Sequence, residues 1–187
     1  ITSFCMIKKE KYFYVESIQD LDLDYIKKTK ARLIIRDKIK HNFSIIHKLI
    51  SKCKERGIVV YVSNDAKLLF RLRLNTFYIS SNNYKHYNWL YDVNKNMKII
   101  GGAHNQNEIK QKINQGCQKI ILSRLFKTYK AGFLNIIKFN NLTLNQKTSF
   151  IALGGINHSN YKKLKIVNCL GIAMLSEQKN KPKYLIG

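Results

Sequence analysis

Short apolar runs in this sequence are followed, one after another, by side chains that can bind an anion. Residues 36–38 (Arg-Asp-Lys) follow one such run, 63–65 (Ser-Asn-Asp) follow the next, and 127–130 (Lys-Thr-Tyr-Lys) follow a later one. Cationic side chains neutralise a phosphate group, and hydroxyl and amide groups donate hydrogen bonds to its oxygens. The pattern therefore predicts a binding site for a phosphorylated small molecule.

One position in this set could also hold a metal ion. Mg²⁺ prefers a carboxylate together with substrate oxygens, and Asp65 beside Asn64 offers a carboxylate and an amide that would share the ion with a diphosphate. The same two residues are also typical of a helix start, because Asp and Asn side chains cap helix N-termini. Both interpretations stay open from the sequence.

Two glycines mark a second possible anion-binding position. Gly154 and Gly155 follow an apolar run. Because glycine has no side chain, backbone N–H groups at these positions can approach a phosphate closely. A tight turn alone would explain the pair equally well. His104 could be a catalytic residue or a hydrogen-bonded loop residue. Lys127 and Lys130 could bind the anion or be ordinary surface charges.

Eight short apolar runs are predicted to be the strands that position these residues. They are rich in β-branched residues and end at turn-forming residues, as buried strands do. The predicted strands are 12–15, 32–36, 58–62, 76–80, 98–101, 119–123, 149–154 and 171–175.

Helical patterns lie between several of these strands. The residues predicted to begin helices are Asn42, Asp65, Asn105 and Ser159, and a further helix is expected within 133–144. Glu108 lies three residues after Asn105, and the two are typical of a capping box.

Strand–helix alternation with apolar strands is typical of a parallel sheet covered by helices. Eight units predict an α/β fold, a compact (β/α)8 TIM barrel that forms a single domain over residues 1–187. The units are short, so the helix after the last strand, within 177–187, is expected to be short or missing. An open doubly wound sheet is the alternative; in either architecture the functional residues lie at the carboxyl ends of the strands.

Charge is the least ordinary property of the chain. Its 34 Lys and Arg residues against 11 Asp and Glu residues give a formal net charge of +23. Such an excess attracts polyanions, so a nucleic-acid-binding module is one interpretation. It is the less favoured one, because only six of these cations are Arg, the residue that makes most specific base contacts.

Composition argues against several other classes of protein. No apolar run approaches the roughly 18 residues of a membrane-spanning helix, and residues 1–10 lack the charge order of a signal peptide. The four Cys and five His residues show no metal-ligand spacing. We therefore expect a cytoplasmic protein that acts on small molecules, with a homo-oligomer among the possible states.

The order of these segments resembles the thiamine phosphate synthase family, including its thiazole tautomerase-like branch. The similarity runs from about residue 12 to residue 176 and is carried by 35–38, 63–65, 102–105, 122–128, 151–156 and 171–176. The last two segments, Ile-Ala-Leu-Gly-Gly-Ile and Gly-Ile-Ala-Met-Leu-Ser, are the most specific.

The resemblance implies a (β/α)8 barrel and a transferase of thiamine biosynthesis. Synthases of this family join hydroxymethylpyrimidine diphosphate to thiazole phosphate, with Mg²⁺, and release diphosphate. The resemblance would make Arg36, Lys38 and Lys130 the catalytic cations at the diphosphate, Asn64, Thr128, Gly154, Gly155, Leu175 and Ser176 the substrate-binding residues, and Asp65 and Asn83 the Mg²⁺ ligands.

The chain also departs from the family pattern. Ile34 stands where the family has a pyrimidine-facing Gln, Asn83 where it has a second Mg²⁺-binding Asp, and Gly102 where it has a Ser. Each change removes a polar partner or a metal ligand, so we expect a weakened Mg²⁺ site. Arg124 occupies the place of the His that the tautomerase branch uses.

Three hypotheses stand on these residues. The retained Arg36, Lys38, Asn64 and Asp65 favour a divergent thiamine phosphate synthase. The departures favour a barrel of the same family that binds a phosphorylated ligand with lost or altered chemistry. The net charge leaves a basic nucleic-acid-binding module as the third.

Overall fold

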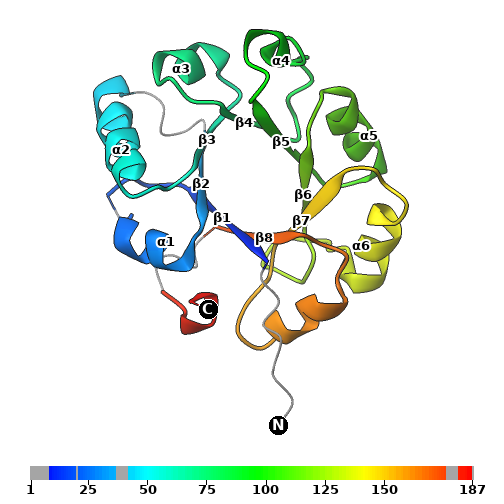
Figure 1. Cartoon of the computed structure of the whole chain (residues 1–187). Coiled ribbons are helices and arrows are strands. Elements are labelled where there is room, and N and C mark those ends of the chain that lie inside the picture. Colours follow the sequence, from blue (N-terminus) through cyan, green and yellow to red (C-terminus); the bar gives the residue numbers. More distant parts are fainter. Residues whose placement is uncertain (1–8, 20, 37–41, 176–180, 187) are drawn as a thin grey trace.

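The computed structural model of the chain describes residues 9–19, 21–36, 42–175 and 181–186. Its eight strands are β1 (Glu10–Val15), β2 (Arg32–Ile35), β3 (Val60–Ser63), β4 (Thr76–Ile79), β5 (Lys98–Ala103), β6 (Lys119–Ser123), β7 (Ser149–Leu153) and β8 (Gly171–Met174). All neighbouring strands pair in parallel, and β8 closes onto β1 (Figure 1). The predicted parallel barrel is confirmed, and the open-sheet alternative is wrong.

Helices surround the barrel on its outer face (Figure 1). They are α1 (Leu23–Thr29), α2 (Phe43–Glu55), α3 (Ala66–Arg71), α4 (Leu90–Val93), α5 (Gln106–Asn114), α6 (Asn135–Thr143) and the 3-10 helices η2 (Tyr161–Ile166) and η3 (Lys183–Leu185). η3 is the short final helix that the chain length predicts. No helix in the described ranges has the length and apolar character needed to cross a membrane.

The helix starts mostly follow the predicted caps. The side chains of Asn42, Asp65 and Asn105 each accept a hydrogen bond from the backbone N–H three residues later, at 3.2, 2.8 and 3.0 Å. The predicted cap at Ser159 is wrong. Its hydroxyl donates to the side chain of Asn157 at 2.6 Å, and η2 begins two residues further on.

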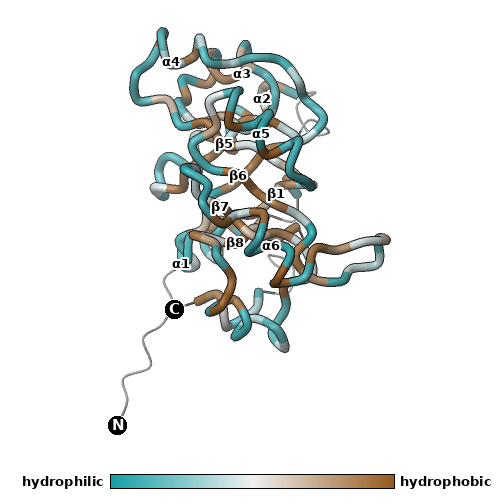
Figure 2. Tube along the Cα trace, turned by 90° about the vertical axis from the view of Figure 1, so that its right-hand side faces the viewer, coloured by the Kyte–Doolittle hydropathy of each residue, from teal (hydrophilic) through white to brown (hydrophobic). Residues whose placement is uncertain are grey.

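The barrel interior is a packed core rather than a channel. Successive residues of a strand face opposite sides, so Tyr12 and Tyr14 point inward while Phe13 and Val15 face the helices. The inward cluster consists of Tyr12, Tyr14, Ile34, Tyr61, Tyr78, Ile100, Ile121, Ile151 and Ala173. In Figure 2 the barrel strands carry most of the apolar colour, while many connecting segments are polar.

A charged cluster closes the amino-terminal end of the barrel. The Glu10 carboxylate accepts hydrogen bonds from Lys119 at 2.7 and 2.8 Å, from the Tyr12 hydroxyl at 2.7 Å and from Arg32 at 3.2 Å. Burial alone would raise the pKa of the Glu10 carboxyl. The hydrogen bonds from Lys119 and Tyr12 and the charge of Arg32 outweigh that effect, so the pKa lies below its ordinary value.

Candidate functional site

A cavity of about 810 Å³ opens at the carboxyl ends of the strands. This end, the C-terminal mouth, receives residues from the ends of β1 to β8 and from the loops that follow them. Its cationic lining residues are Arg36, Arg124, Lys127 and Lys130. No Asp or Glu side chain belongs to the lining within the part of the chain that the structure describes. The electrostatic character of the cavity therefore favours an anionic ligand.

The structure brings most of the predicted site residues to this cavity. Arg36, Asn64, Thr128, Lys130, Gly154, Gly155 and Leu175 all line it. Lys38 and Ser176 lie outside the described residues. Asp65 and Asn83 are described but do not belong to the lining.

Arg36 is held at the rim of the mouth by two contacts. Its Nη1 atom lies 3.4 Å from the Glu16 carboxylate, and both side chains are about half exposed. Its guanidinium carbon lies 5.6 Å from the centre of the Tyr14 ring. An exposed ion pair of this kind contributes little stability, so Arg36 can exchange Glu16 for an anionic ligand at low cost.

Two tyrosines form the floor of the cavity, and sequence reasoning did not identify them. The Tyr14 hydroxyl donates to the Tyr78 hydroxyl at 3.0 Å, and the two rings meet edge to face. Burial raises the pKa of Tyr14 well above its ordinary value, and the neighbouring Tyr78 adds to the effect. Both rings belong to the inward-facing core, and their packing fixes the floor of the cavity.

The tyrosine floor explains why residue 102 is a glycine. A Cβ atom on Gly102 would lie 2.5 Å from the Tyr78 hydroxyl oxygen, closer than packed atoms approach. Gly102, which stands where the family pattern has a Ser, is therefore coupled by packing to Tyr78 on β4. The Tyr78 hydroxyl thus occupies the space that a side chain at position 102 would need.

Asn64 ties the loop after β3 to the loop after β4. Its side-chain oxygen accepts hydrogen bonds from the Ser80 N–H at 3.0 Å and from the Asn83 amide at 2.9 Å. Its amide nitrogen donates to the Ser80 hydroxyl at 2.9 Å, and the Tyr87 hydroxyl donates to its backbone carbonyl at 3.1 Å. We call these four residues the amide clasp; it fixes one wall of the cavity.

The predicted Mg²⁺ ligands have other partners in the structure. Asp65 caps α3 through its Oδ1 atom, and the side-chain oxygen of Asn83 accepts from the Lys85 N–H at 2.9 Å. Among the described residues, no group of three His, Cys, Asp or Glu side chains is placed to hold a metal ion. The residues present therefore do not fit the two-ligand Mg²⁺ site that the resemblance implies.

Gly154 and Gly155 pack closely against the chain that follows β6. Hydrogen bonds from Leu125 to Leu153 at 2.8 Å and from Phe126 to Gly154 at 3.0 Å extend the pairing of the two strands. Gly155 has φ +67°, and a Cβ atom there would lie 2.6 Å from the Lys127 carbonyl oxygen. Glycine is required here because two loops meet, and the pair also lines the cavity.

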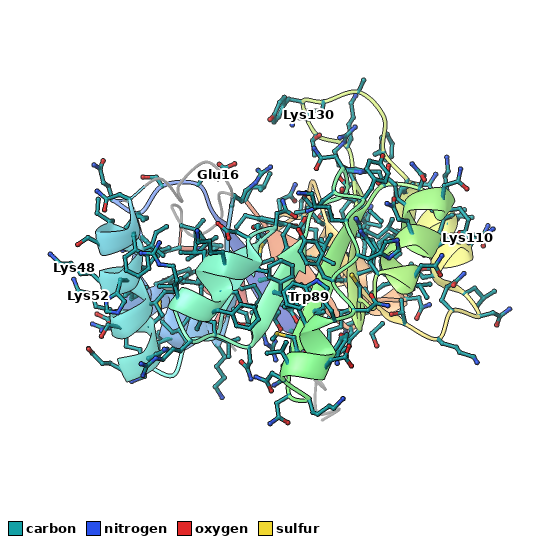
Figure 3. All side chains as sticks on the ribbon, turned by 90° about the horizontal axis from the view of Figure 1, so that it is seen from above. Glu16, Lys48, Lys52, Trp89, Lys110 and Lys130 are labelled. Carbon is teal, nitrogen blue, oxygen red and sulfur yellow. The ribbon has the colours of Figure 1, made fainter. Side chains whose placement is uncertain are left out.

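The loop after β6 carries the most projecting cations of the mouth. Arg124 donates to the carbonyl groups of Ala131 and Gly132, the latter at 3.0 Å, and so closes the loop on itself. The Lys130 ammonium lies 5.6 Å from the centre of the highly exposed Tyr129 ring. Figure 3 shows Lys130 raised above the barrel, on the same end as Glu16. No described carboxylate forms a salt bridge with Lys127 or Lys130.

His104 has the hydrogen-bonded role that was one of its two interpretations. Its backbone N–H and its Nδ1 atom lie 2.8 and 2.9 Å from the Glu108 carboxylate, which also completes the capping box with Asn105. His104 lines the mouth, but its contacts organise the start of α5.

The sequence is similar over part of its length to a curated enzyme. The chain is 34% identical over 83 residues to a thiamine-phosphate synthase of Prochlorococcus marinus. The aligned region covers 42% of this chain and 24% of the relative. The chain thus aligns with about a quarter of that relative's length. No family model matches the sequence.

Solved structures share the fold at low sequence identity. A thiamine phosphate pyrophosphorylase from Pyrococcus furiosus superposes with a TM-score of 0.73 at 14% identity, covering 96% of this chain and 94% of the other. A thiamine phosphate pyrophosphorylase from Bacteroides thetaiotaomicron gives 0.61 at 15%, covering 90% and 83%. An aldolase from Escherichia coli gives 0.61 at 10%, covering 90% and 76%.

The structural matches establish the barrel fold, and the local sequence match is to a thiamine-phosphate synthase. The resemblance predicted from the sequence is confirmed as a similarity: part of the chain is similar to a thiamine-phosphate synthase, and the whole fold is similar to two thiamine phosphate pyrophosphorylases.

Proposed function

We propose that the chain is a divergent thiamine phosphate synthase, which joins hydroxymethylpyrimidine diphosphate to thiazole phosphate and releases diphosphate. One observation carries the proposal: the C-terminal mouth is lined by four cationic side chains and by no described carboxylate. Such a site suits substrates and a product that are all phosphorylated. The similarity to a thiamine-phosphate synthase supports this reaction among those of phosphorylated molecules.

The chain's cations have a defined task in this reaction. The bond between the pyrimidine methylene carbon and the diphosphate oxygen breaks, and the electron pair leaves with the oxygen. Arg36 on one side of the mouth and the Lys127 and Lys130 ammonium groups on the other stabilise the charge that develops there. The thiazole nitrogen then supplies the electron pair for the new carbon–nitrogen bond.

The floor of the cavity supports the same sequence of steps. Tyr14 and Tyr78 present aromatic surface where the pyrimidine carries developing positive charge, and ring faces stabilise cations. Ile121, Leu153 and Ala173 line the cavity beside them and exclude water, which would otherwise capture the cation. The substrates are held in line by the walls.

A second function is favoured by a specific observation. Ile34, which takes the place of the family's pyrimidine-facing Gln, is fully buried in the inward core and does not line the cavity. A barrel that binds a phosphorylated ligand without joining two substrates needs no such contact. The same cationic mouth would then serve binding alone.

The test is product formation by the purified protein with both substrates, followed by mass spectrometry of thiamine phosphate and by diphosphate release. Product from the wild-type chain, with at least tenfold less from Lys130→Ala, supports the synthase. Lys48→Ala, which removes an exposed lysine of α2 far from the mouth, is the matched control. Absence of product, with thermal stabilisation by either substrate, would select the second function.

A further inference from the structure

We propose that this chain binds diphosphate without a divalent metal ion, through the cations of the C-terminal mouth alone. The inference rests on the proposed function, because it concerns how the same mouth holds the diphosphate group. Three features of the folded chain support it: the hydrogen bond made by Asp65, the hydrogen bonds made by Asn64 and Asn83, and the buried cation Lys112.

The first observation concerns the one described carboxylate among the predicted ligands. Asp65 Oδ1 accepts the Leu68 N–H at 2.8 Å and so begins α3. A capping Asp satisfies a backbone donor that would otherwise be unpaired and stabilises a helix by about 1 kcal/mol. Asp65 does not line the cavity. Its position in the sequence is accounted for by the helix, without a metal ion.

The second observation concerns the amide oxygens that could replace carboxylates. Asn64 Oδ1 accepts two hydrogen bonds, from Ser80 and from Asn83, which saturates its two lone pairs. Asn83 Oδ1 accepts from Lys85, while its amide nitrogen donates to Asn64 and Tyr87. Coordination of Mg²⁺ through these oxygens would break the amide clasp that joins the loops after β3 and β4.

The third observation is a cation directly behind the clasp. Lys112 of α5 is fully buried, and its ammonium group donates to the Asn83 carbonyl and to the Gln115 side chain, both at 2.8 Å. Gln115 also donates to the carbonyl groups of Asn83 and Lys85 at 2.9 and 2.7 Å. A divalent cation at Asn83 would stand close to this buried positive charge, and like charges in a poorly solvated setting repel strongly.

Charge compensation is available elsewhere in the mouth. A diphosphate carries about three negative charges near neutral pH, and its oxygens accept from Arg and Lys donors. Arg36 projects from the end of β2, and Lys127 and Lys130 project from the loop after β6, on the opposite side of the barrel. The cations thus occupy two sides of the cavity, where they can neutralise the anion that Mg²⁺ neutralises in other diphosphate sites.

The test is calorimetric titration of the full chain with inorganic pyrophosphate in metal-free buffer containing trace EDTA, and again with Mg²⁺. We expect binding in metal-free buffer, with a dissociation constant no more than threefold weaker than in Mg²⁺. Binding that requires Mg²⁺ would overturn this inference while leaving the proposed function standing. No binding in either buffer would overturn the proposed function as well.

Two variants sharpen the result. Asp65→Asn keeps a helix-capping side chain but removes the carboxylate. The melting temperature should therefore not change, and the pyrophosphate affinity in Mg²⁺ should stay within twofold of wild type. The variant Lys127→Ala/Lys130→Ala should bind about 30-fold more weakly in metal-free buffer, while Lys48→Ala should not change. A tenfold loss of affinity in a well-folded Asp65→Asn protein would contradict the inference.

Discussion

The two ends of the barrel use charged side chains in opposite ways. At the amino-terminal end, the Glu10 carboxylate is surrounded by Lys119, Arg32 and the Tyr12 hydroxyl, so positive and negative groups neutralise one another inside the fold. At the C-terminal mouth, the cations face a cavity whose described lining holds no carboxylate. At the amino-terminal end the charged groups pair with one another and close the barrel. At the C-terminal mouth the cations face the cavity, where an anionic ligand can pair with them.

Residues that stabilise the fold and residues that would bind a ligand thus lie at opposite ends of the barrel. Residues of the closed end should change the free energy of unfolding and leave ligand affinity intact. Residues of the open end should do the reverse. The Tyr14–Tyr78 pair lies between the two ends and forms the floor of the cavity, so it should affect both.

The largest effect is expected at the closed end, from Glu10→Ala. Removal of the carboxylate leaves Arg32 and Lys119 unpaired and only about a quarter exposed, and should lower the free energy of unfolding by about 3 kcal/mol. Urea denaturation measures this loss. Pyrophosphate affinity of the folded variant should stay within twofold of wild type, and a parallel loss of affinity would break the separation between the two ends.

The complementary change at the open end is Lys127→Ala/Lys130→Ala. This double variant should lose about 2 kcal/mol of pyrophosphate binding free energy. Its free energy of unfolding should not fall with it. Both side chains are exposed, so the unfolding free energy should change by less than about 0.5 kcal/mol. A large destabilisation would show that these cations hold the loop rather than the ligand.

A smaller effect is expected at the floor, from Gly102→Ala. The added methyl group collides with the Tyr78 hydroxyl, and overpacking of this kind should cost about 1.5 kcal/mol of unfolding free energy. Tyr78→Phe removes the hydroxyl and should restore part of the loss in the double variant. Additive losses in the double-mutant cycle would mean that the two residues do not compete for the same space.

The smallest effect is a pH dependence of stability at the closed end. The pKa of Glu10 is lower in the folded chain than its ordinary value of 4.5, so its ionised form stabilises the fold above that value. This contribution is lost as the pH falls below about 4.5 through the folded pKa. Glu10→Gln should flatten the stability curve in that window, and an unchanged curve would assign the acid sensitivity to other carboxyl groups.

The strands were predictable from the sequence because each is a short apolar run bounded by turn residues, and every predicted boundary lies within two residues of the observed one. Two helices were not predicted. α1 begins at an Asp22 cap, with only seven residues to carry a pattern, and α4 has four residues. Segments of that length have no measurable helical periodicity.

The site was predictable where it depends on strand order and was not predictable where it depends on packing. Arg36, Thr128 and Lys130 follow strands, so a parallel barrel brings them to one end. The contact of Tyr14 with Tyr78 joins residues 64 positions apart, and no local pattern reports it. Asp65 had two interpretations in the sequence, and only the structure shows which hydrogen bond its carboxylate makes.

Metal-free diphosphate binding is tested most directly by a crystal structure of the full chain with inorganic pyrophosphate in metal-free solution. We expect the anion in the C-terminal mouth, within hydrogen-bond distance of Arg36 and of Lys127 or Lys130, with the amide clasp unchanged. Pyrophosphate bound elsewhere, or bound in the mouth only after Mg²⁺ is added and held by Asp65 and Asn83, would contradict this expectation.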